Sequence, residues 1–368
     1  MSFTTVLVTG ATGFIGGATT AQLLDDARMD RVLLLVRAPS ESAAWERVRR
    51  SLARFKPIAE VERERARIGI ILGDICDGEA LADPRLDTVT HVLHAAANTS
   101  FRSIREVHRT NVLGTLALAH RMLSAPQLER FVYVSTAYCC GAAPAAVVHE
   151  DHSPRPDAPH VVEYTRSKAE SELLLDTSAS RLPLVIARPS VVIGHTELGC
   201  APSTSLIWYY RALSRLGRAP FSPQCTRDIV PVDYVAEALQ LLLFSTDLKW
   251  RIYHVSAGER ARVPWQEIAA TFARHDGVSS VEPPLSVRAD SIADAARLRR
   301  VFGPGDAERL AGAIELCARF GGIGVEYFDN SRLLAEGMRA PPKLTDYLDR
   351  CITHPPGRSV YEELDDDA

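Results

Sequence analysis

The sequence is short of lysine, lacks a long apolar run and has almost no excess of charge of either sign. Only four of its 42 basic residues are lysines, and the formal net charge of the 368 residues is -4. Nothing in this balance would draw the chain to nucleic acid or to an anionic membrane surface. The most apolar stretch, residues 235–244, is interrupted by Glu237 and Gln240. We therefore expect no nucleic acid partner and no membrane span.

The seven cysteines lack the paired spacings of a disulfide framework or a metal site. They are scattered over positions 76, 139, 140, 200, 225, 317 and 351. The first residues also lack the basic stretch of a secretory signal. His91 and His94 are three residues apart in a predicted strand, where they would face opposite sides. These absences predict reduced thiols, a cytoplasmic location and no bound metal.

The sequence is rich in strand-like apolar runs that alternate with helix-like segments. Hydrophobic residues make up 46% and charged residues 24%, which is the balance of a folded domain. The runs are apolar on both faces, as in strands that helices cover on either side. In the first half we predict strands at 6–9, 32–36, 67–72, 89–95 and 131–135, and helices at 18–27, 42–55 and 104–123. This alternation predicts the α/β class, with a doubly wound, Rossmann-like parallel sheet.

A glycine-rich turn follows the first predicted strand and opens the next helix. It runs from Gly10 to Gly16, with the letters GATGFIG. Gly10 permits the tight turn, Gly13 lets the backbone approach a pyrophosphate, and Gly16 allows close packing of helix on strand. In this setting the glycines indicate a dinucleotide site rather than a plain tight turn. The expected cofactor contacts in the turn are Gly10, Thr12, Gly13, Phe14, Ile15 and Gly16.

The end of the second predicted strand carries no acidic residue, although NAD enzymes usually have one there. The chain has Arg37 at this place, and a guanidinium suits a 2′-phosphate better than a bare 2′-hydroxyl. Arg47, Arg49 and Arg50 on the following helix could reach the same phosphate, and Arg47 is favoured by position. NADPH is therefore the predicted cofactor. The alternative for Arg37 is an exposed charge at a strand end.

Tyr164 and Lys168 stand four residues apart in a predicted helix over residues 161–175, so they share one face. An ammonium beside a phenol lowers the pKa of the phenol toward working pH, which suits acid–base chemistry. Thr136 ends the fifth strand, at the sheet edge where α/β proteins bind ligands, and its hydroxyl could hold a substrate carbonyl oxygen. An incidental pair on a surface helix is the other interpretation of Tyr164 and Lys168.

The second half is less regular. We predict strands at 184–187 and 253–255 and a helix at 232–244, with the remaining glycine and proline concentrated at 196–227 and 259–368. The expected division is a NADP-binding domain of residues 1–195 plus about 228–258, and a smaller substrate-binding lobe of 196–227 plus 259–368. The acidic end, residues 362–367, is expected to be a solvated tail.

Together these motifs resemble the extended short-chain dehydrogenases/reductases, from residue 5 to about residue 258. The motifs behind this resemblance are the glycine turn, Gly73-Asp74-Ile75, His94-Ala95-Ala96-Ala97, Asn111–Thr115, Ser135-Thr136, Tyr164 with Lys168, and Arg188-Pro189. Within that superfamily the chain is similar to the branch of thioester reductases and fatty acyl-CoA reductases. The branch features are the segments Leu35–Ala38, His94–Phe101, Val134–Cys139 and Asp228–Ala236.

The resemblance implies a role for each matching residue. Thr136, Tyr164 and Lys168 would form the catalytic trio, with Lys168 also on the cofactor ribose. The further cofactor contacts implied are Asp74 and Ile75 beside the adenine, Ala95, Ala96 and Ala97 along the cofactor, Asn111 on the nicotinamide side, Ser135, and Pro189 with Val191 over the ring. The implied reaction is NADPH-dependent reduction of an acyl thioester to an aldehyde, with a further step to the alcohol left open.

Several alternatives stay open at this point. Other extended members act on ketones, hydroxyls or sugar nucleotides, and a dinucleotide-sensing regulator would need no catalytic trio. The acyl group is unspecified, and either coenzyme A or an acyl or peptidyl carrier protein could bear it. Cys139 and Cys140 are interpreted as small buried hydrophobes rather than acyl acceptors. Trp208, Tyr209 and Tyr210 are assigned by default to core packing, and an acyl channel is the alternative.

Overall fold

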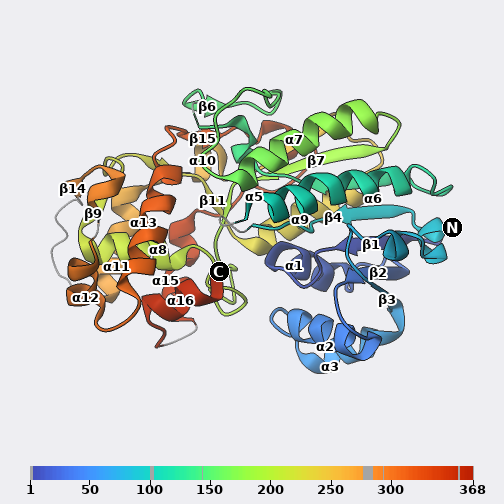
Figure 1. Cartoon of the computed structure of the whole chain (residues 1–368), viewed down its shortest axis with the longest axis horizontal. Coiled ribbons are helices and arrows are strands. Elements are labelled where there is room, and N and C mark those ends of the chain that lie inside the picture. The colour runs from blue at the N-terminus through green and yellow to red at the C-terminus, as the bar shows by residue number, and fades with distance from the viewer. Residues whose placement is uncertain are drawn as a thin grey trace.

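The computed structural model describes residues 3–99, 103–142, 144–276, 285–292, 294–354 and 357–367. Its centre is a seven-stranded sheet in the order β12-β7-β5-β4-β1-β2-β3, and every neighbouring pair is parallel. The strands are β1 (Thr5–Thr9), β2 (Arg31–Val36), β3 (Ile68–Leu72), β4 (His91–His94), β5 (Arg130–Val134), β7 (Leu184–Pro189) and β12 (Ile252–Val255). The predicted doubly wound parallel sheet is confirmed (Figure 1).

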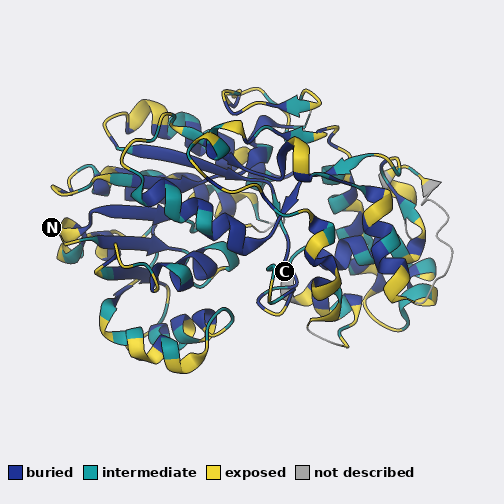
Figure 2. Ribbon diagram, turned by 180° about the vertical axis from the view of Figure 1, so that it is seen from behind, coloured by how far each residue is buried: buried dark blue, intermediate teal, exposed yellow. Residues whose placement is uncertain are grey.

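Helices cover both faces of this sheet, because successive side chains of each strand point to opposite sides. Val6 and Val8 of β1 belong to one apolar core and Leu7 to another. The helices around the sheet are α1 (Phe14–Leu23), α2 (Glu41–Leu52), α3 (Ile58–Arg63), α4 (Gly78–Leu81), α5 (Ile104–His108), α6 (Thr115–Met122), α7 (Glu163–Ser178) and α9 (Val232–Phe244). Short helical turns lie at η1 (Glu64–Arg67), η2 (Pro84–Thr88) and η4 (Ala137–Cys140). Figure 2 shows the strands buried between these layers.

The predicted helix over residues 104–123 is interrupted by a π-helical turn, η3 (Arg109–Gly114), between α5 and α6. A π-turn carries one extra residue and is frequent at functional sites. Here it contains Asn111, whose carbonyl oxygen accepts a hydrogen bond from the Ser171 hydroxyl at 2.8 Å. The periodicity of apolar residues does not reveal such an insertion, because it shifts the register by a single residue.

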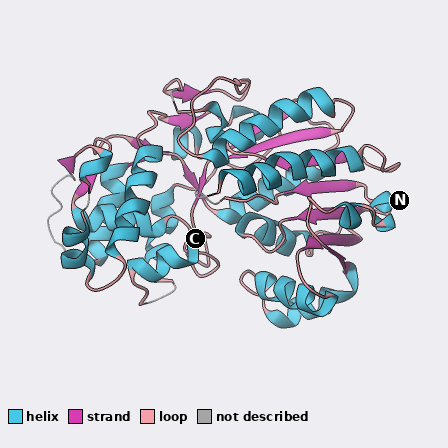
Figure 3. Ribbon diagram, in the orientation of Figure 1, coloured by secondary structure: helices cyan, strands magenta, loops and turns pink. Residues whose placement is uncertain are grey.

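Most of the remaining helices gather beside the carboxyl edge of the sheet (Figure 3). They are α8 (Ile207–Leu216), α10 (Gly258–Ala261), α11 (Trp265–His275), η5 (Ala289–Ser291), α12 (Ala295–Phe302), α13 (Ala307–Gly321), α14 (Ser331–Ala335), α15 (Leu344–Thr353) and α16 (Val360–Asp367). The two-residue strands are β6 (Val147–Val148), β8 (Val191–Val192), β9 (Arg218–Ala219), β10 (Thr226–Arg227), β11 (Ile229–Val230), β13 (Val263–Pro264), β14 (Leu285–Ser286) and β15 (Tyr327–Phe328). A separate apolar core, rich in aromatic residues, holds α8, α11, α13 and α15 together.

One segment of the C-terminal half returns to the sheet. β15 pairs with β6, and Leu333 and Met338 join the apolar core on one face of the sheet. The division of the chain into a NADP-binding domain and a substrate lobe stays a prediction.

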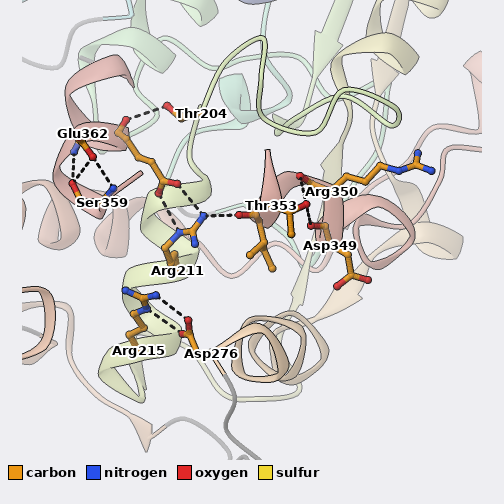
Figure 4. Close-up of polar contacts among 11 residues, drawn as sticks. Thr204, Arg211, Arg215, Asp276, Asp349, Arg350, Thr353, Ser359 and Glu362 are labelled. Carbon is orange, nitrogen blue, oxygen red and sulfur yellow. Dashed lines mark hydrogen bonds and ion pairs between the residues drawn. The ribbon is translucent and has the colours of Figure 1, made fainter. Parts of the chain in front are cut away.

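The acidic C-terminus forms a helix instead of the expected solvated tail. Leu364 of α16 is buried, and the Glu363 carboxylate pairs with Arg211 of α8 at 2.9 Å. Figure 4 shows Arg211 and, one helical turn away, Arg215 paired with Asp276. The charge pattern suggested solvent exposure, but a partly buried guanidinium gives the carboxylate a partner and offsets its desolvation.

Candidate active site

The sequence-predicted residues meet at the carboxyl edge of the parallel sheet, where ligands of open α/β sheets bind. A cavity of about 440 Å³ lies there between the sheet and the C-terminal helices. Its walls include Thr136 and Ser135 after β5, Tyr164 and Lys168 on α7, and the turn before α1. Pro189 and Val191, which the resemblance places over a nicotinamide ring, also line it.

The glycine turn has the geometry that its sequence predicts. Gly10 has a φ of +76°, and a Cβ there would come within 2.7 Å of the backbone of Ala95 and Ala96. A Cβ on Gly16 would overlap the carbonyl oxygen of Gly10. Gly13 caps α1 without a side-chain hydrogen bond, which leaves N–H groups of the first turn for an outside acceptor. These features fit the pyrophosphate of a dinucleotide.

Gly16→Ala should lower the free energy of unfolding by at least about 2 kcal/mol, because the added methyl group displaces the turn. Affinity for NADPH should fall by at least about 10-fold, since the same turn would hold the pyrophosphate. Denaturant unfolding and cofactor titration measure the two effects. Gly312→Ala is the matched control, because a Cβ on this α13 residue meets nothing within 4 Å. Equal stability and affinity in the two variants would contradict this interpretation of the turn.

A second hollow of about 200 Å³ adjoins the turn on the side of β2. Its walls include Thr12, Arg37, Arg47, Asp74, Ile75, Ala95, Ala96 and Ala97, all predicted as cofactor contacts. The Arg37 side chain is 69% exposed and lies 3.5 Å from the Asp74 carboxylate, so it is not committed to a tight ion pair. Arg47 donates a hydrogen bond to the carbonyl oxygen of Arg37. The two arginines therefore stand together at the end of β2.

Lys168 is buried beneath the cavity. Its Nζ donates to the carbonyl oxygen of Val134 at 2.7 Å and lies 4.7 Å from the centre of the Tyr133 ring. Burial lowers the pKa of Lys168 to about 7, although Glu172 nearby favours the charged form. The ammonium is therefore in balance with the free amine near neutral pH.

The expected lowering of the Tyr164 pKa is wrong. Burial raises the pKa of Tyr164 to about 12, and the Cys139 sulfur adds to this effect. The spacing of four residues does place Tyr164 and Lys168 on the same cavity wall. Desolvation of the phenol outweighs any help from the ammonium, which burial has itself weakened. Tyr164 thus keeps its proton at neutral pH and is a hydrogen-bond donor.

Asn111 connects the loop after β4 to α7. Its Oδ1 accepts from the Asn98 backbone N–H at 2.7 Å, and its Nδ2 donates to the Asn98 carbonyl at 3.0 Å and to Ser167 at 2.9 Å. The side chain is completely buried. Asn111 therefore supports the loop that continues from Ala95–Ala97 and lines neither of the two cavities, so its predicted place on the nicotinamide side stays a prediction.

A buried ion pair beneath the cavity was not predicted. Arg188 of β7 and Glu172 of α7 pair at 2.6 Å, and both side chains are almost inaccessible. The Ser135 hydroxyl donates to the same carboxylate, so Ser135 both lines the cavity and connects to this pair. Arg188 belongs to one of the motifs behind the resemblance, but no pattern in the sequence points to Glu172 as its partner. The pair fixes β7 against α7, which carries Tyr164 and Lys168.

Cys139 and Cys140 are buried thiols, in agreement with their interpretation as small hydrophobes. Burial raises the pKa of Cys139 well above its ordinary value and that of Cys140 to about 12. A thiol with a raised pKa is a poor nucleophile because so little of it is thiolate. Within the described residues, no cluster of three or more histidine, cysteine or acidic side chains could hold a metal ion.

The substrate side of the cavity is largely apolar and comes from the C-terminal helices. The lining residues there include Leu206, Tyr209, Tyr210, Leu316, Phe320, Ile323, Val325 and Phe328. Two of the three clustered aromatic residues thus face the cavity as well as the core, and Trp208 lies within the core. In the part of the chain that the structure describes, no helix is long and apolar enough to cross a membrane.

Comparisons with known proteins agree with this fold and site. Residues 8–239 match the NAD-binding family described as male sterility protein, and the chain belongs to that family. This confirms the predicted place among extended short-chain dehydrogenases/reductases, on the thioester and fatty acyl-CoA reductase branch. A nicotinamide dinucleotide is accordingly its cofactor class.

Among curated relatives, the nonribosomal peptide synthetase FrzA of Cladobotryum sp. is 28% identical over 272 residues, 70% of this chain and 26% of its own. The aldehyde reductase lnaA of Aspergillus flavus is 27% identical over 268 residues, 68% of this chain and 25% of its own. A candidate fatty acyl-CoA reductase of Drosophila melanogaster is 29% identical over 276 residues, covering 62% and 50%. The chain thus spans about a quarter of the first relatives and half of the last.

Solved structures share the fold over almost the whole chain. A reductase domain of a nonribosomal peptide synthetase from Mycobacterium tuberculosis superposes with a TM-score of 0.72 at 24% identity, covering 95% of this chain and 91% of that one. A UDP-glucose 4-epimerase of Thermotoga maritima gives 0.63 at 18% identity, covering 94% and 97%. The same fold therefore occurs in reductases and in epimerases. The fold does not decide between these two activities, so the distinction depends on the residues that line the cavity.

Proposed function

We propose that this protein is a NADPH-dependent reductase that converts an acyl thioester to an aldehyde. The observation that carries the proposal is one cavity that joins the dinucleotide turn, the trio Thr136, Tyr164 and Lys168, and an apolar wall. Such a wall suits an acyl chain and offers little to a sugar nucleotide, which needs many polar partners. Relatives named as peptide synthetases and as a fatty acyl-CoA reductase support a thioester substrate.

In this proposal the cofactor supplies the hydride for the thioester carbonyl carbon. The protein stabilises and protonates the carbonyl oxygen. Thr136 and Tyr164 donate hydrogen bonds to the carbonyl oxygen as it gains negative charge. Tyr164 then passes its proton to that oxygen, which gives a hemithioacetal. When the carbon–sulfur bond breaks, the hydroxyl proton returns to Tyr164, and the thiolate leaves and takes a proton from water. The products are one aldehyde and one thiol.

The remaining assignments belong to the same proposal. Arg37 and Arg47 would hold the 2′-phosphate, and Lys168 would hold the ribose. Coenzyme A or a carrier protein presents the acyl group, the C-terminal lobe encloses it, and the protein acts in the cytoplasm.

The central experiment follows NADPH loss and thiol release together across acyl-coenzyme A and acyl-carrier thioesters of several chain lengths. We expect one thiol for each aldehyde formed. Turnover of ketones or sugar nucleotides, without reduction of any thioester, would replace this proposal with the broader dehydrogenase or epimerase alternative.

Wild-type protein should bind NADPH at least about 10-fold more tightly than NADH, because a guanidinium at the end of β2 can pair with the 2′-phosphate. Arg37→Asp should lose most of that preference. Arg50→Asp is the control, since this exposed arginine of α2 does not line the cofactor hollow. Titration of each protein with both cofactors measures the ratio. Equal affinity of the wild type for NADH and NADPH would show that Arg37 does not read the phosphate.

The double variant Cys139→Ala, Cys140→Ala should retain thioester reduction within about 3-fold, because the proposed reaction forms no acyl-cysteine. Its stability should fall modestly, by about 1 kcal/mol for each buried sulfur removed. Intact-mass measurement during turnover should detect no acyl group on the wild type. An acylated wild type whose adduct and activity both disappear in the double variant would require a covalent route instead.

A further inference from the structure

Two polar side chains on the substrate side of the cavity have unused hydrogen-bonding capacity. The Tyr209 hydroxyl on α8 and Nε of Arg227 on β10 are buried, and neither has a hydrogen-bond partner among the described residues. Tyr209 is 3% exposed and Arg227 is 8% exposed. A buried polar atom without a partner is destabilising, so such atoms are rare unless something else supplies the partner.

These two groups converge on one place. A Cβ built on Gly321 would lie 3.3 Å from Cε1 of Phe221, 3.5 Å from the Tyr209 hydroxyl oxygen and 3.7 Å from Nη1 of Arg227. Gly321, Tyr209 and Arg227 all line the same cavity. Position 321 therefore lies beside both polar groups, and a glycine there adds no side chain against either of them.

The guanidinium is held firmly in this position. Nη1 of Arg227 donates to the Gly321 carbonyl at 2.8 Å, Nη2 donates to the Cys225 sulfur at 2.6 Å, and the group lies 4.0 Å from the centre of the Phe221 ring. A guanidinium fixed by packing and two hydrogen bonds is preorganised to bind an acceptor, so little entropy is lost on binding.

No carboxylate of the described residues forms an ion pair with Arg227. The neighbouring Asp228 is directed elsewhere, because its carboxylate accepts from the backbone N–H groups of Ala257 at 2.7 Å, Phe328 at 3.0 Å and Gly258 at 3.3 Å. The guanidinium has donors only, so the partner that Nε lacks is a hydrogen-bond acceptor, such as a carbonyl oxygen.

We propose that Arg227 and Tyr209 bind a carbonyl oxygen of the substrate at a distance from the reacting thioester. The inference rests on the proposed function, because it assumes that an acyl thioester occupies this cavity. Apart from the pair, the cavity wall here is mainly apolar. Leu316, Phe320 and Ile323, which are close to Gly321 in the sequence, line it. One polar anchor in an apolar cavity gives a preference for oxygen-bearing substrates. The oxygen belongs either to the acyl group or to an amide of the pantetheine arm.

The test compares decanoyl thioesters with a set of oxodecanoyl thioesters that differ in the position of the keto group. Each acyl group is offered on coenzyme A and on N-acetylcysteamine, which lacks the second amide of the pantetheine arm. If the acyl group is the source, one keto position should raise kcat/KM by at least about 10-fold on both carriers. If the arm is the source, coenzyme A should be preferred over N-acetylcysteamine by a similar factor.

Whichever substrate the wild type prefers, Tyr209→Phe and Arg227→Met should bring the ratio of kcat/KM between the preferred and the other substrate close to one. Tyr347→Phe is the matched control, because this buried tyrosine of the same helical core also has a hydroxyl with no hydrogen-bond partner among the described residues but does not line the cavity. Tyr209→Phe should melt no lower than the wild type, since it removes a hydroxyl that makes no hydrogen bond to any described residue. Unchanged preferences in both cavity variants, or no preference in the wild type, would overturn the proposal.

Calorimetric binding of the corresponding decanamides and oxodecanamides separates this inference from the reductase proposal. Both are amides, which are not reduced under assay conditions, so binding is measured without turnover. If an oxo preference in binding is lost in Tyr209→Phe while no thioester is reduced, the reductase proposal fails and the binding site stands. If thioesters are reduced but neither variant changes any ratio, the reductase proposal stands and this site fails.

Discussion

Replacing Tyr164 with phenylalanine is expected to lower the turnover of thioesters by about 100-fold or more. The variant loses a hydroxyl that lines the cavity and gives up little packing. Burial raises the pKa of this phenol to about 12, so the hydroxyl carries its proton at neutral pH and can donate to the forming oxyanion. Affinity for NADPH should change little, because the effect is on the reacting oxygen. Steady-state kinetics and cofactor titration on the same preparation separate the two readouts.

Tyr361→Phe serves as the control for this experiment. Tyr361 lies on α16, away from the cavity, and its hydroxyl makes only a 3.4 Å hydrogen bond to the carbonyl of Gly303. This variant should turn over at the wild-type rate. Full activity in Tyr164→Phe would mean that another group protonates the oxyanion, and the assignment of Tyr164 would have to be withdrawn.

Lys168→Ala should impair both catalysis and cofactor binding. We expect kcat/KM to be at least about 100-fold lower and NADPH affinity at least about 10-fold weaker. Lys168 is buried under the cavity and is proposed to reach the ribose as well as to support Tyr164. Lys168→Met fills most of the same volume without the ammonium, so it should show the same two losses with a smaller effect on folding. Lys249→Ala, on a residue outside the cavity, should show neither.

The pH dependence of cofactor binding provides an independent check on Lys168. Its pKa is lowered from 10.5 to about 7 by burial, so the ammonium is present below that pH and lost above it. If the ammonium binds the cofactor, wild-type affinity for NADPH should fall as the pH rises through about 7, and bound cofactor should shift the transition to higher pH. Lys168→Met should lack this transition. A decline of the same size in the variant would attribute the titration to another group.

The parallel sheet and the glycine turn were predictable because their signals are local. Strands covered on both faces need continuous apolar runs, and β1, β2 and β5 have them. The turn likewise depends on backbone freedom at Gly10 and on close packing at Gly16. The spacing of the three glycines in the sequence predicts both features. The proximity of residues at the ends of two neighbouring strands is also predictable, because the carboxyl ends of parallel strands lie at the same edge of the sheet.

Features that depend on burial or on distant partners were not predictable. The spacing of Tyr164 and Lys168 indicated a lowered phenol pKa, but desolvation raises it to about 12. The acidic C-terminal segment suggested a solvated tail, but the segment forms a helix in which Glu363 pairs with Arg211 of the helical core. In each case the side chain's environment comes from segments far away in the sequence, and its effect on charge exceeds that of the near neighbours.

The sequence by itself therefore determined the class of fold, the dinucleotide turn and the residues that gather at the carboxyl edge, because periodicity and spacing act over a few residues. The tertiary structure alone decided the protonation of Tyr164 and Lys168, the Glu172–Arg188 pair beneath them, and the polar pair of Tyr209 and Arg227 in an apolar cavity. These properties depend on which groups lose contact with water and which partners replace it, and packing across the whole chain determines both.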